Sequence, residues 1–512
     1  MGAVNRRDLL RLGAATGGAA AVTLAPVDFA NADDDSGDHA GDDARPETRT
    51  VRGHLDTGAP DFVYVPVRVP RGVRRLAVSY SYDRPQVPAG TPGNALDIGI
   101  FDERGTELGG EGFRGWSGGA RTEFFLSAEE ATPGYLAGPV NAGTWHVALG
   151  PYTIAPQGLD YELTITLEYG AAGTTQRPAY PRERARGRGR AWYRGDCHLH
   201  TVHSDGRRTP AELAAAARAA GLDFIVTTEH NTHSAHAAFR GLDGDDLLIL
   251  CGEEVTTRNG HYLALGTDPG TFVDWRYRAR DDAYPRYARR IHRAGGLVVP
   301  AHAHATCIGC SWKFGFREAD AVELWNGAWT AEEELALASW ESLLRGGDDW
   351  LPAMGNSDAH REPQPVGLAQ TVVLADGLDR RSILAAIAAG RSYLAESSSV
   401  TLDLTVTDER GQRVGVGERL DAPPERRVTV RLDASGVPGG VLRLITDQGL
   451  MRSTQLSSDI NSGTLTWKTT VSLVAYVRAE VRHRPADGGA SGLPGAMAAM
   501  SNPVFLGGSS GR

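Results

Sequence analysis

Short apolar segments between residues 196 and 360 each run into histidine or carboxylate side chains at the point where a buried strand is expected to end. The chain has 15 histidines in 512 residues, and eleven of them fall in this interval. The polar segments are 196–205, 228–231, 252–261, 302–304 and 356–360. Because the ends of barrel strands converge at one mouth, we expect these segments to meet there. Imidazole mixed with carboxylate suits Zn²⁺, Mn²⁺ or Fe²⁺ better than Ca²⁺ or Mg²⁺.

The first pair of histidines illustrates the geometry. In Asp-Cys-His-Leu-His at 196–200, alternate side chains of an extended strand point to one face, so His198 and His200 can reach one ion. A single buried histidine more often satisfies a hydrogen bond in a core. Five such motifs, each after an apolar strand, are hard to place in a core where every polar group needs a partner. The pattern therefore predicts a metal site.

Two changes of pattern along the chain predict a multidomain protein. Apolar strand candidates alternate with helices in the middle of the chain, which favours a parallel sheet or barrel. Helices are expected at 210–220, 284–294, 331–344 and 379–389, the first behind a capping box at Thr209-Pro210-Ala211-Glu212. Alternating, β-branched segments lie on both sides of this region. The expected domains are a jelly-roll-like β-sandwich at 47–170, an arginine- and proline-rich linker at 171–191, the α/β domain at 192–395 and a second β-sandwich with a flexible tail at 396–512.

The first 32 residues have the features of an export signal. Arg6 and Arg7 precede a weakly apolar stretch rich in alanine and glycine, and Ala30-Asn31-Ala32 has the spacing of a cleavage site. This is a twin-arginine pattern, and that pathway carries folded proteins, so a metal site could be filled before export. The acidic segment at 33–46 lacks large apolar residues and is expected to be disordered. We therefore expect a secreted or cell-envelope protein.

Composition narrows the class of partner. The net charge is −10 at pH 7, which argues against a general nucleic-acid binder. No segment approaches the ~20 apolar residues that cross a bilayer, so we expect no integral membrane association. We therefore expect the partner to be a small-molecule substrate, and a small anionic one would suit a locally positive site. The sequence does not predict an oligomeric state.

The four cysteines are too few for a disulfide scaffold. Cys307-Ile308-Gly309-Cys310 follows the last histidine pair directly, and in an exported protein a local disulfide that braces the loop before Trp312 is the preferred interpretation. A redox motif would need a thioredoxin-like context, and a structural zinc site would need two more ligands nearby. Cys197 and Cys251 lie inside strand-end motifs and are expected to be buried thiols.

Three motifs together resemble the PHP (polymerase and histidinol phosphatase) family of metallohydrolases. They are Asp-x-His-x-His-Thr-x-x-Ser-Asp-Gly at 196–206, Thr-x-His-Asn at 228–231 and Ser-Asp-x-His at 357–360. Glu-Leu-Trp-Asn-Gly at 323–327 is similar to the CehA/McbA-type branch, which is named for carbaryl hydrolysis. The resemblance covers residues 192–400 and implies a distorted, TIM-like (β/α)7 barrel that holds three divalent transition metal ions, Zn, Mn or Fe. The ligands that it implies are His198, His200, Asp205, His230, Glu254, His261, His302, Asp358 and His360.

The resemblance also implies how these ligands divide. One ion would be shared by His198, His200 and Asp358. A second would be held by Asp205, His230 and His360. Glu254 would bridge, and His261 with His302 would complete the third ion. Asp196 would orient a ligand imidazole from outside the cluster.

Three positions depart from the family pattern. Glu229 stands where an aspartate is usual and is one methylene longer, which leaves its contact open. Glu253 and Glu254 are adjacent and point oppositely if extended, and their register favours Glu254 as the ligand. His304 follows His302 where relatives often have proline, so it is a spare ligand or a general acid.

The reaction implied is hydrolysis of a phosphomonoester or phosphodiester by a hydroxide that bridges two ions. His304 and His203 are candidates for protonating the leaving group. Lys313 and Arg361 lie just beyond metal motifs and are candidates for gripping a phosphate, although each could equally be an exposed charge. Two alternatives stay open: the same site hydrolyses a carbamate or carboxylic ester, or the chain is a non-catalytic surface binding protein.

Overall fold

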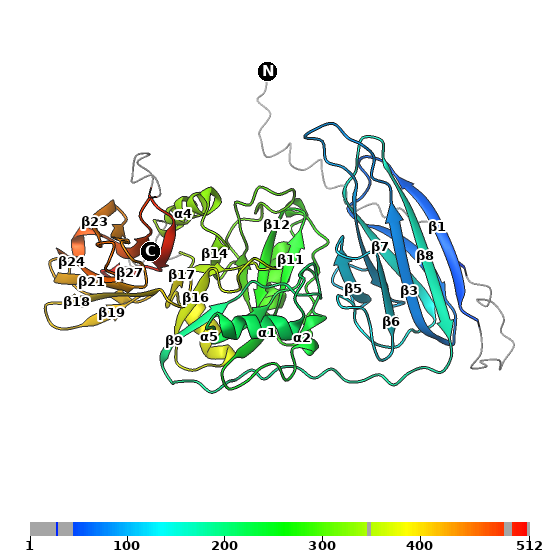
Figure 1. Ribbon diagram of the computed structural model, residues 1–512, viewed down its shortest axis with the longest axis horizontal. Coiled ribbons are helices and arrows are strands. Elements are labelled where there is room, and N and C mark those ends of the chain that lie inside the picture. The colour runs from blue at the N-terminus through cyan, green and yellow to red at the C-terminus, as the bar shows by residue number, and fades with distance from the viewer. Residues whose placement is uncertain (1–26, 29–44, 346–349, 486–493, 509–512) are drawn as a thin grey trace, which may run out of the picture. The chain divides into compact units, whose positions relative to one another are not determined.

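The computed structural model describes residues 27–28, 45–345, 350–485 and 494–508 (Figure 1). The predicted export signal at 1–32 and the acidic segment at 33–46 lie outside the described residues, apart from residues 27, 28, 45 and 46. The chain forms two compact units. The first has residues 1–132 and 137–175, and the second has residues 133–136 and 176–512. No helix in the described part of the chain is long and apolar enough to cross a membrane.

The first unit contains two four-stranded antiparallel sheets. One has the order β1 (Glu47–Leu55), β8 (Leu159–Tyr169), β3 (Val73–Tyr82) and β6 (Glu123–Ser127). The other has the order β2 (Val63–Val69), β7 (Gly143–Thr153), β4 (Ala95–Phe101) and β5 (Phe113–Gly118). Alternate residues of β8 are buried, which is the pattern of a sheet with one face in a core. The predicted strand content of 47–170 is confirmed, while its jelly-roll connectivity stays a prediction.

The second unit is organised on a 13-stranded mixed sheet. Its first part has the order β13 (Leu297–Pro300), β12 (Gly260–Leu265), β11 (Leu248–Thr257), β10 (Phe224–Thr227), β9 (Ala191–Asp196), β16 (Gln370–Ala375) and β17 (Ser392–Ala395). The sheet continues through β26 (Met497–Ser501), β25 (Tyr476–Arg482), β22 (Val441–Thr446) and β23 (Gly449–Gln455), with β27 (Val504–Leu506) and β20 (Arg419–Leu420) at its side. Two smaller sheets are β14 (Val322–Asn326) with β15 (Ala353–Asn356), and β19 (Arg413–Gly415), β18 (Thr401–Asp408), β21 (Arg427–Ser435) and β24 (Ser462–Thr470).

The helices of the described residues all belong to the second unit. They are α1 (Pro210–Ala219), α2 (Ala235–Ala238), α3 (Tyr284–Arg293), α4 (Ala331–Leu344) and α5 (Arg380–Ala388), with 3-10 turns at η1 (Ala279–Asp281) and η2 (Val471–Leu473). α1 begins behind Thr209, which forms the predicted capping box with Glu212. The four helices expected from the sequence are confirmed to within two residues at each end.

The regular strand–helix alternation expected of a (β/α)7 barrel is only partly present. β9, β10 and β11 are parallel, but β12 is antiparallel to both β11 and β13, and β16 is antiparallel to β9. β11 and β12 form a hairpin that turns at Arg258 and Asn259, so no helix can separate them. β14 pairs with β15 and not with β13. The structure therefore shows a multidomain protein with a mixed α/β sheet, and barrel closure stays a prediction.

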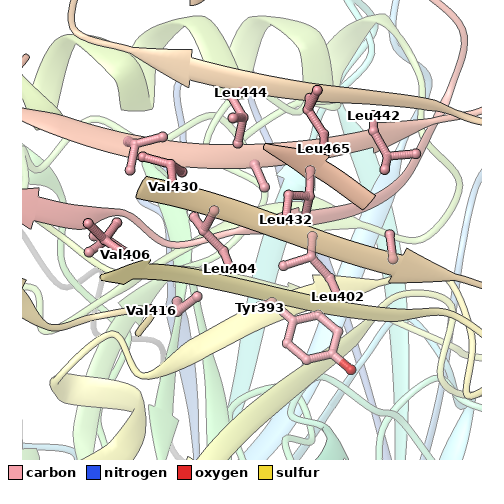
Figure 2. Close-up of a cluster of buried hydrophobic side chains, with 14 of the residues drawn as sticks. Tyr393, Leu402, Leu404, Val406, Val416, Val430, Leu432, Leu442, Leu444 and Leu465 are labelled. Atoms are coloured by element: carbon pink, nitrogen blue, oxygen red, sulfur yellow. The ribbon is translucent and has the colours of Figure 1, made fainter. Parts of the chain in front are cut away.

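The C-terminal strands share a core with the α/β strands. Figure 2 shows apolar side chains of β18, β21 and β22 packed together, with Tyr393 of β17 at the edge of the cluster. The ladder also runs directly from β17 to β26. The region predicted as a second sandwich is thus joined to the α/β strands by a continuous sheet.

Asn502 fixes β15 to this C-terminal region. Its side chain is fully buried and exchanges hydrogen bonds with the backbone of Ala353: Ala353 N donates to Oδ1 (2.8 Å), and Nδ2 donates to Ala353 O (3.1 Å). Nδ2 also donates to Ser392 Oγ (2.8 Å) in β17. Because β15 leads into Ser-Asp-x-His at 357–360, this amide positions a metal motif.

We expect Asn502→Ala to lower the free energy of unfolding by about 2–4 kcal/mol, because it leaves buried backbone groups of Ala353 without partners at about 1–3 kcal/mol each. Urea unfolding followed by circular dichroism measures the change. Asn461→Ala, at an exposed position of the same region, is the control and should change stability little. Equal stability of the two variants would contradict this role.

Candidate metal centre

The structure brings all nine predicted ligands to one place. β9 leads into His198 and His200, β10 into His230, β13 into His302, and β15 into Asp358 and His360. Glu254 lies on β11 and His261 on β12, where the hairpin that departs from the regular barrel places them side by side. Asp205 comes from the loop after β9 and lies 3.3 Å from His230 Nε2 and 3.2 Å from His360 Nε2.

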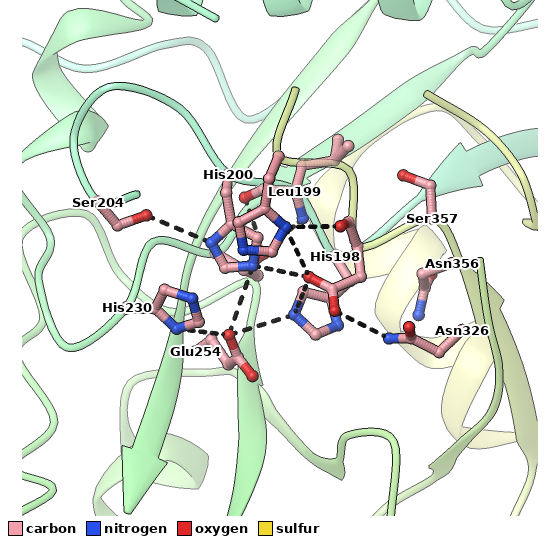
Figure 3. Close-up of polar contacts among 12 residues, drawn as sticks. His198, Leu199, His200, Ser204, His230, Glu254, Asn326, Asn356 and Ser357 are labelled. Carbon is pink, nitrogen blue, oxygen red and sulfur yellow. Dashed lines mark hydrogen bonds and ion pairs between the residues drawn. The ribbon is translucent and has the colours of Figure 1, made fainter. Parts of the chain in front are cut away.

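The Glu254 carboxylate lies at the centre of this cluster. Five imidazole nitrogens lie 2.8–3.4 Å from its two oxygens, those of His198, His200, His230, His261 and His302. Figure 3 shows the carboxylate facing the rings of His198, His200 and His230. Glu253, its neighbour on β11, instead points away and accepts the backbone N–H of Val273 (3.1 Å). The geometry therefore brings Glu254, rather than Glu253, to the other predicted ligands.

A second carboxylate faces the same two histidines. Asp358 Oδ1 lies 3.3 Å from His198 Nε2 and 3.0 Å from His200 Nε2. The potential ligand atoms form three sets, each within 4.8 Å: His200, Asp205, His230 and His360; His198, His200 and Asp358; and His198, Glu254 and His302. These sets resemble the predicted division, except that His302 groups with His198 and Glu254, and His261 joins none of them.

Several buried atoms of the cluster have no hydrogen-bond partner among the described residues. They are His198 Nε2, His200 Nε2, Glu254 Oε2, His261 Nε2, His302 Nδ1 and Asp358 Oδ1. Buried polar atoms are almost always hydrogen-bonded, so six orphaned atoms in one cluster need an explanation. Lone pairs that converge without hydrogen-bond geometry are what divalent cations require. The residues present therefore fit metal binding.

Hydrogen bonds from outside orient the ligand rings. His198 Nδ1 contacts Glu323 Oε1 (3.0 Å), and His200 Nδ1 contacts Ser204 Oγ (3.3 Å). Each contact uses Nδ1 and leaves Nε2 toward the cluster, which is the arrangement that ligating histidines need. His230 differs, because its Nδ1 lies 2.8 Å from both Thr256 Oγ1 and Glu254 Oε2, while its Nε2 faces Asp205 (3.3 Å).

Asp196 has a role other than the one expected. Asp196 was predicted to orient an imidazole, but it accepts backbone N–H groups of His198, Ser357 and Gly367 (2.9–3.3 Å). It therefore ties two ligand loops together, and Glu323 takes the predicted role. Burial raises the pKa of Asp196 to about 6.

Glu229 is buried and is connected to His200 through Ser204. Its extra methylene lets the carboxylate reach Thr201 Oγ1 and Ser204 Oγ, both of which donate at 2.5 Å. Ser204 in turn contacts His200, so Glu229 acts on this ligand through a hydroxyl group. Burial raises the pKa of Glu229.

Sequence reasoning missed Glu323, Ser204, Thr256, Asn326 and Asn356 as parts of the site. Glu323 and Asn326 belong to the Glu-Leu-Trp-Asn-Gly segment at 323–327, and Ser204 lies inside Ser-Asp-Gly at 204–206. Both segments entered the sequence analysis only through their resemblance to the PHP family, and no contact was predicted for these three residues. Thr256 lies two residues after Glu254 on a strand with no distinguishing pattern.

Charge and burial have opposite effects on the pKa values of Glu254 and His198, and both lower the pKa of His200. Burial would raise the pKa of Glu254, but positive charge on His230 and His198 holds that pKa well below its usual value. Burial would lower the pKa of His198, but Asp358, Glu323 and Glu254 raise it well above the usual value. For His200, burial and the neighbouring His360 and His230 together lower the pKa to about 3.

Two ligands have strained backbones. His302 has φ 27° and Asp358 has φ 49°, in a region that residues other than glycine seldom adopt. Such conformations cost about 1–3 kcal/mol and concentrate at functional sites.

The four candidates for catalysis belong to none of the three sets of potential ligand atoms. His203 Nδ1 contacts Ser234 Oγ (2.9 Å), and His304 is half-buried two residues beyond His302. Lys313 is exposed and donates to Ser311 Oγ (2.7 Å), and Arg361 is exposed next to His360. Their catalytic roles stay predictions.

The cysteines follow the sequence prediction. Cys307 and Cys310 form a disulfide with a Cα–Cα distance of 5.4 Å, and Cys197 and Cys251 are buried thiols. The disulfide loop accepts the N–H of Gly260 through Gly309 O (2.8 Å), next to His261.

No protein-family model and no curated protein matches the sequence. Among solved structures, the chain is similar to a two-domain protein from Bacteroides vulgatus that contains a predicted PHP-like metal-dependent phosphoesterase, with 17% identity over 60% of this chain and 95% of that chain and a TM-score of 0.35. It is also similar to a candidate metal-dependent phosphoesterase from Bifidobacterium adolescentis, with 20% identity over 34% of this chain and 90% of that chain and a TM-score of 0.24. An amidohydrolase from Chromobacterium violaceum, solved with sulfate and without metal, has 20% identity over 34% of this chain and 89% of that chain and a TM-score of 0.24. These values are low, so the functional conclusion rests on the geometry of the site.

We expect Glu254→Gln to lower the affinity for Zn²⁺ or Mn²⁺ by about 100-fold or more, because losing even an outer partner of a ligand costs about 10–100-fold. Metal analysis after equilibrium dialysis measures it. Glu253→Gln is the matched control, since Glu253 is equally buried on the same strand but faces away. Equal metal content in both variants would show that Glu254 is not a ligand.

We expect metal binding to release protons. Neighbouring carboxylates outweigh burial and raise the pKa values of His198 and His230, so an ion must compete with protons for these rings. Apparent affinity should therefore rise as pH rises from about 6 to 8. Calorimetric titration in two buffers of different ionisation enthalpy counts the protons. Zero released protons, with an affinity that does not change with pH, would contradict this expectation.

Proposed function

We propose that the chain is a metal-dependent hydrolase of the PHP type that cleaves a phosphate ester. The observation that carries the proposal is the cluster of orphaned, buried ligand atoms around Glu254 and Asp358. Glu254 Oε2, Asp358 Oδ1 and the unpartnered imidazole nitrogens near them would cost free energy to bury unless cations compensated them. Three overlapping sets of ligand atoms support more than one ion, and we propose three ions of Zn, Mn or Fe.

The cluster is open on one side. The side chains of His198, His200 and Glu254 are at most 1% exposed, whereas Asp205 is 47% exposed. His230 and His360, on either side of Asp205, are each 23% exposed. A substrate would therefore approach over Asp205, and the buried members would hold ions behind it.

Divalent ions held there would supply Lewis acidity, which polarises the scissile bond and lowers the pKa of water. The protein's own part is to fix the ligand rings through Glu323, Ser204 and Thr256 and to keep water from the inner side. A phosphate ester suits such a site because several cations can neutralise the charge on its oxygens.

Proton transfer to the leaving group would come from the rim. His304 is half-buried and adjacent to a ligand segment, and His203 lies in the loop that carries Asp205. We propose one of these two histidines as the acid. Lys313 and Arg361, both exposed, are proposed to contact the phosphate.

Export through the twin-arginine pathway is part of the proposal. Arg6, Arg7 and the Ala30-Asn31-Ala32 pattern support it. The Cys307–Cys310 disulfide also supports it, because disulfides persist in oxidising compartments.

A second candidate function uses the same ions on a different bond. The Glu-Leu-Trp-Asn-Gly segment, similar to the CehA/McbA-type branch, favours hydrolysis of an aryl carbamate or carboxylic ester. A third, a non-catalytic surface binding protein, would bind ions and hydrolyse nothing.

We expect the mature chain, loaded with Mn²⁺ or Zn²⁺, to hydrolyse nitrophenyl phosphate mono- or diesters and to lose this activity after chelation. Readdition of metal should restore it, because ions that the ligands hold reversibly supply the chemistry. Faster hydrolysis of aryl carbamates than of aryl phosphates would move the assignment to the second candidate. Bound metal with no hydrolysis of either class would favour the third.

A further inference from the structure

Glu323 is a buried carboxylate next to the metal cluster with four hydrogen-bond partners. It lies on β14, and its side chain has no exposed surface. Oε1 contacts His198 Nδ1 (3.0 Å) and accepts from Asn356 Nδ2 (2.9 Å). Oε2 accepts the backbone N–H of His302 (3.0 Å) and Nδ2 of Asn326 (3.0 Å). Each oxygen therefore has two donors.

The four donors belong to four different segments. His198 follows β9, His302 follows β13, Asn326 ends β14 and Asn356 ends β15. β13 and β14 share no ladder, so this carboxylate supplies a connection between them that the sheet does not. Glu323 accepts the backbone N–H of His302, which is the residue with φ 27°.

Two of the donors, Asn326 and Asn356, also contact other residues of the site. Asn326 Nδ2 also lies 3.3 Å from Asp358 Oδ2, and Asn356 Oδ1 accepts the N–H of Cys197 (2.9 Å), next to His198. Figure 3 shows Asn326 and Asn356 beside the His198 ring. Three ligands, His198, His302 and Asp358, are thus tied to Glu323 directly or through one amide.

Glu323 is not one of the ligands. Among the described residues it belongs to none of the three sets of convergent ligand atoms. Its oxygens are engaged by donors, and its contact with His198 is to Nδ1, on the side of the ring opposite the cluster. An anion at Nδ1 keeps the proton there and makes Nε2 the better electron donor.

We infer that Glu323 is a positioning residue that sets the affinity and coordination geometry of the ion held by His198, Glu254 and His302. This inference rests on the proposed metal function. It goes beyond that function by assigning control of one ion to a side chain that does not touch it.

The test is metal binding by Glu323→Gln. The amide cannot accept at both oxygens, so one pair of donors loses its acceptor and the His198 ring loses its anionic partner. We expect the affinity for Co²⁺ to fall by about 10–100-fold. We also expect the visible absorption of the bound Co²⁺ to change, since that spectrum reports ligand geometry and does not depend on activity.

Glu253→Gln is the matched control. Glu253 is a buried glutamate next to Glu254 on β11, and its carboxylate accepts the backbone N–H of Val273 (3.1 Å) instead of contacting a ligand ring. Replacing this carboxylate by an amide keeps its size and an acceptor oxygen for the N–H of Val273. We expect this variant to keep the wild-type Co²⁺ affinity and spectrum.

Asn326→Ala keeps the inference testable if Glu323→Gln does not fold. Asn326 is half-buried and joins Glu323 to Asp358, so its loss should lower Co²⁺ affinity in the same direction by a smaller factor. Wild-type affinity and spectrum in the folded Glu323→Gln protein, or in Asn326→Ala if the former is unfolded, would overturn the inference. Failure of the wild-type protein to bind Co²⁺ would instead overturn the proposed function.

Discussion

The Glu254 carboxylate, buried among five imidazoles, is the interaction on which the α/β unit depends. Removing a carboxylate from water is unfavourable unless opposite charge or hydrogen bonds replace the lost hydration. Here the compensation is concentrated at one point, where strands far apart in sequence end. Protonated histidines can provide part of it, and divalent ions provide it without leaving lone pairs unpartnered.

The surrounding fold holds this arrangement through polar contacts rather than through a regular sheet. Asp196 ties the loops after β9 and β15 by accepting their backbone N–H groups. Glu323 connects β14 to the residues after β9 and β13. Asn502, far along the chain, holds the first residue of β15. The C-terminal strands therefore contribute to the geometry of the site as well as to the core shown in Figure 2.

The features that the sequence predicted correctly depend on residues close together in the chain. The capping box at Thr209 predicted α1, the alternation of His198 and His200 predicted a shared face, and Cys307 and Cys310 were close enough to predict a disulfide. Strand direction was not predictable, because an apolar run reads the same in β12, which is antiparallel, as in β10, which is parallel. The role of Glu323 was missed for a related reason: a carboxylate inside an apolar strand gives no sign of which distant ring it will meet. Asp196 was predicted to contact an imidazole, but it accepts the backbone N–H groups of Ser357 and Gly367 instead.

Anomalous diffraction from crystals grown with Zn²⁺ or Mn²⁺, recorded at the absorption edge of the metal, tests the central claim most directly. The account predicts at least two separate peaks inside the cluster, with one of them about 2.0–2.2 Å from His198 Nε2 and from a Glu254 oxygen. The absence of any peak within coordination distance of Glu254, in crystals that show the metal elsewhere, would contradict it.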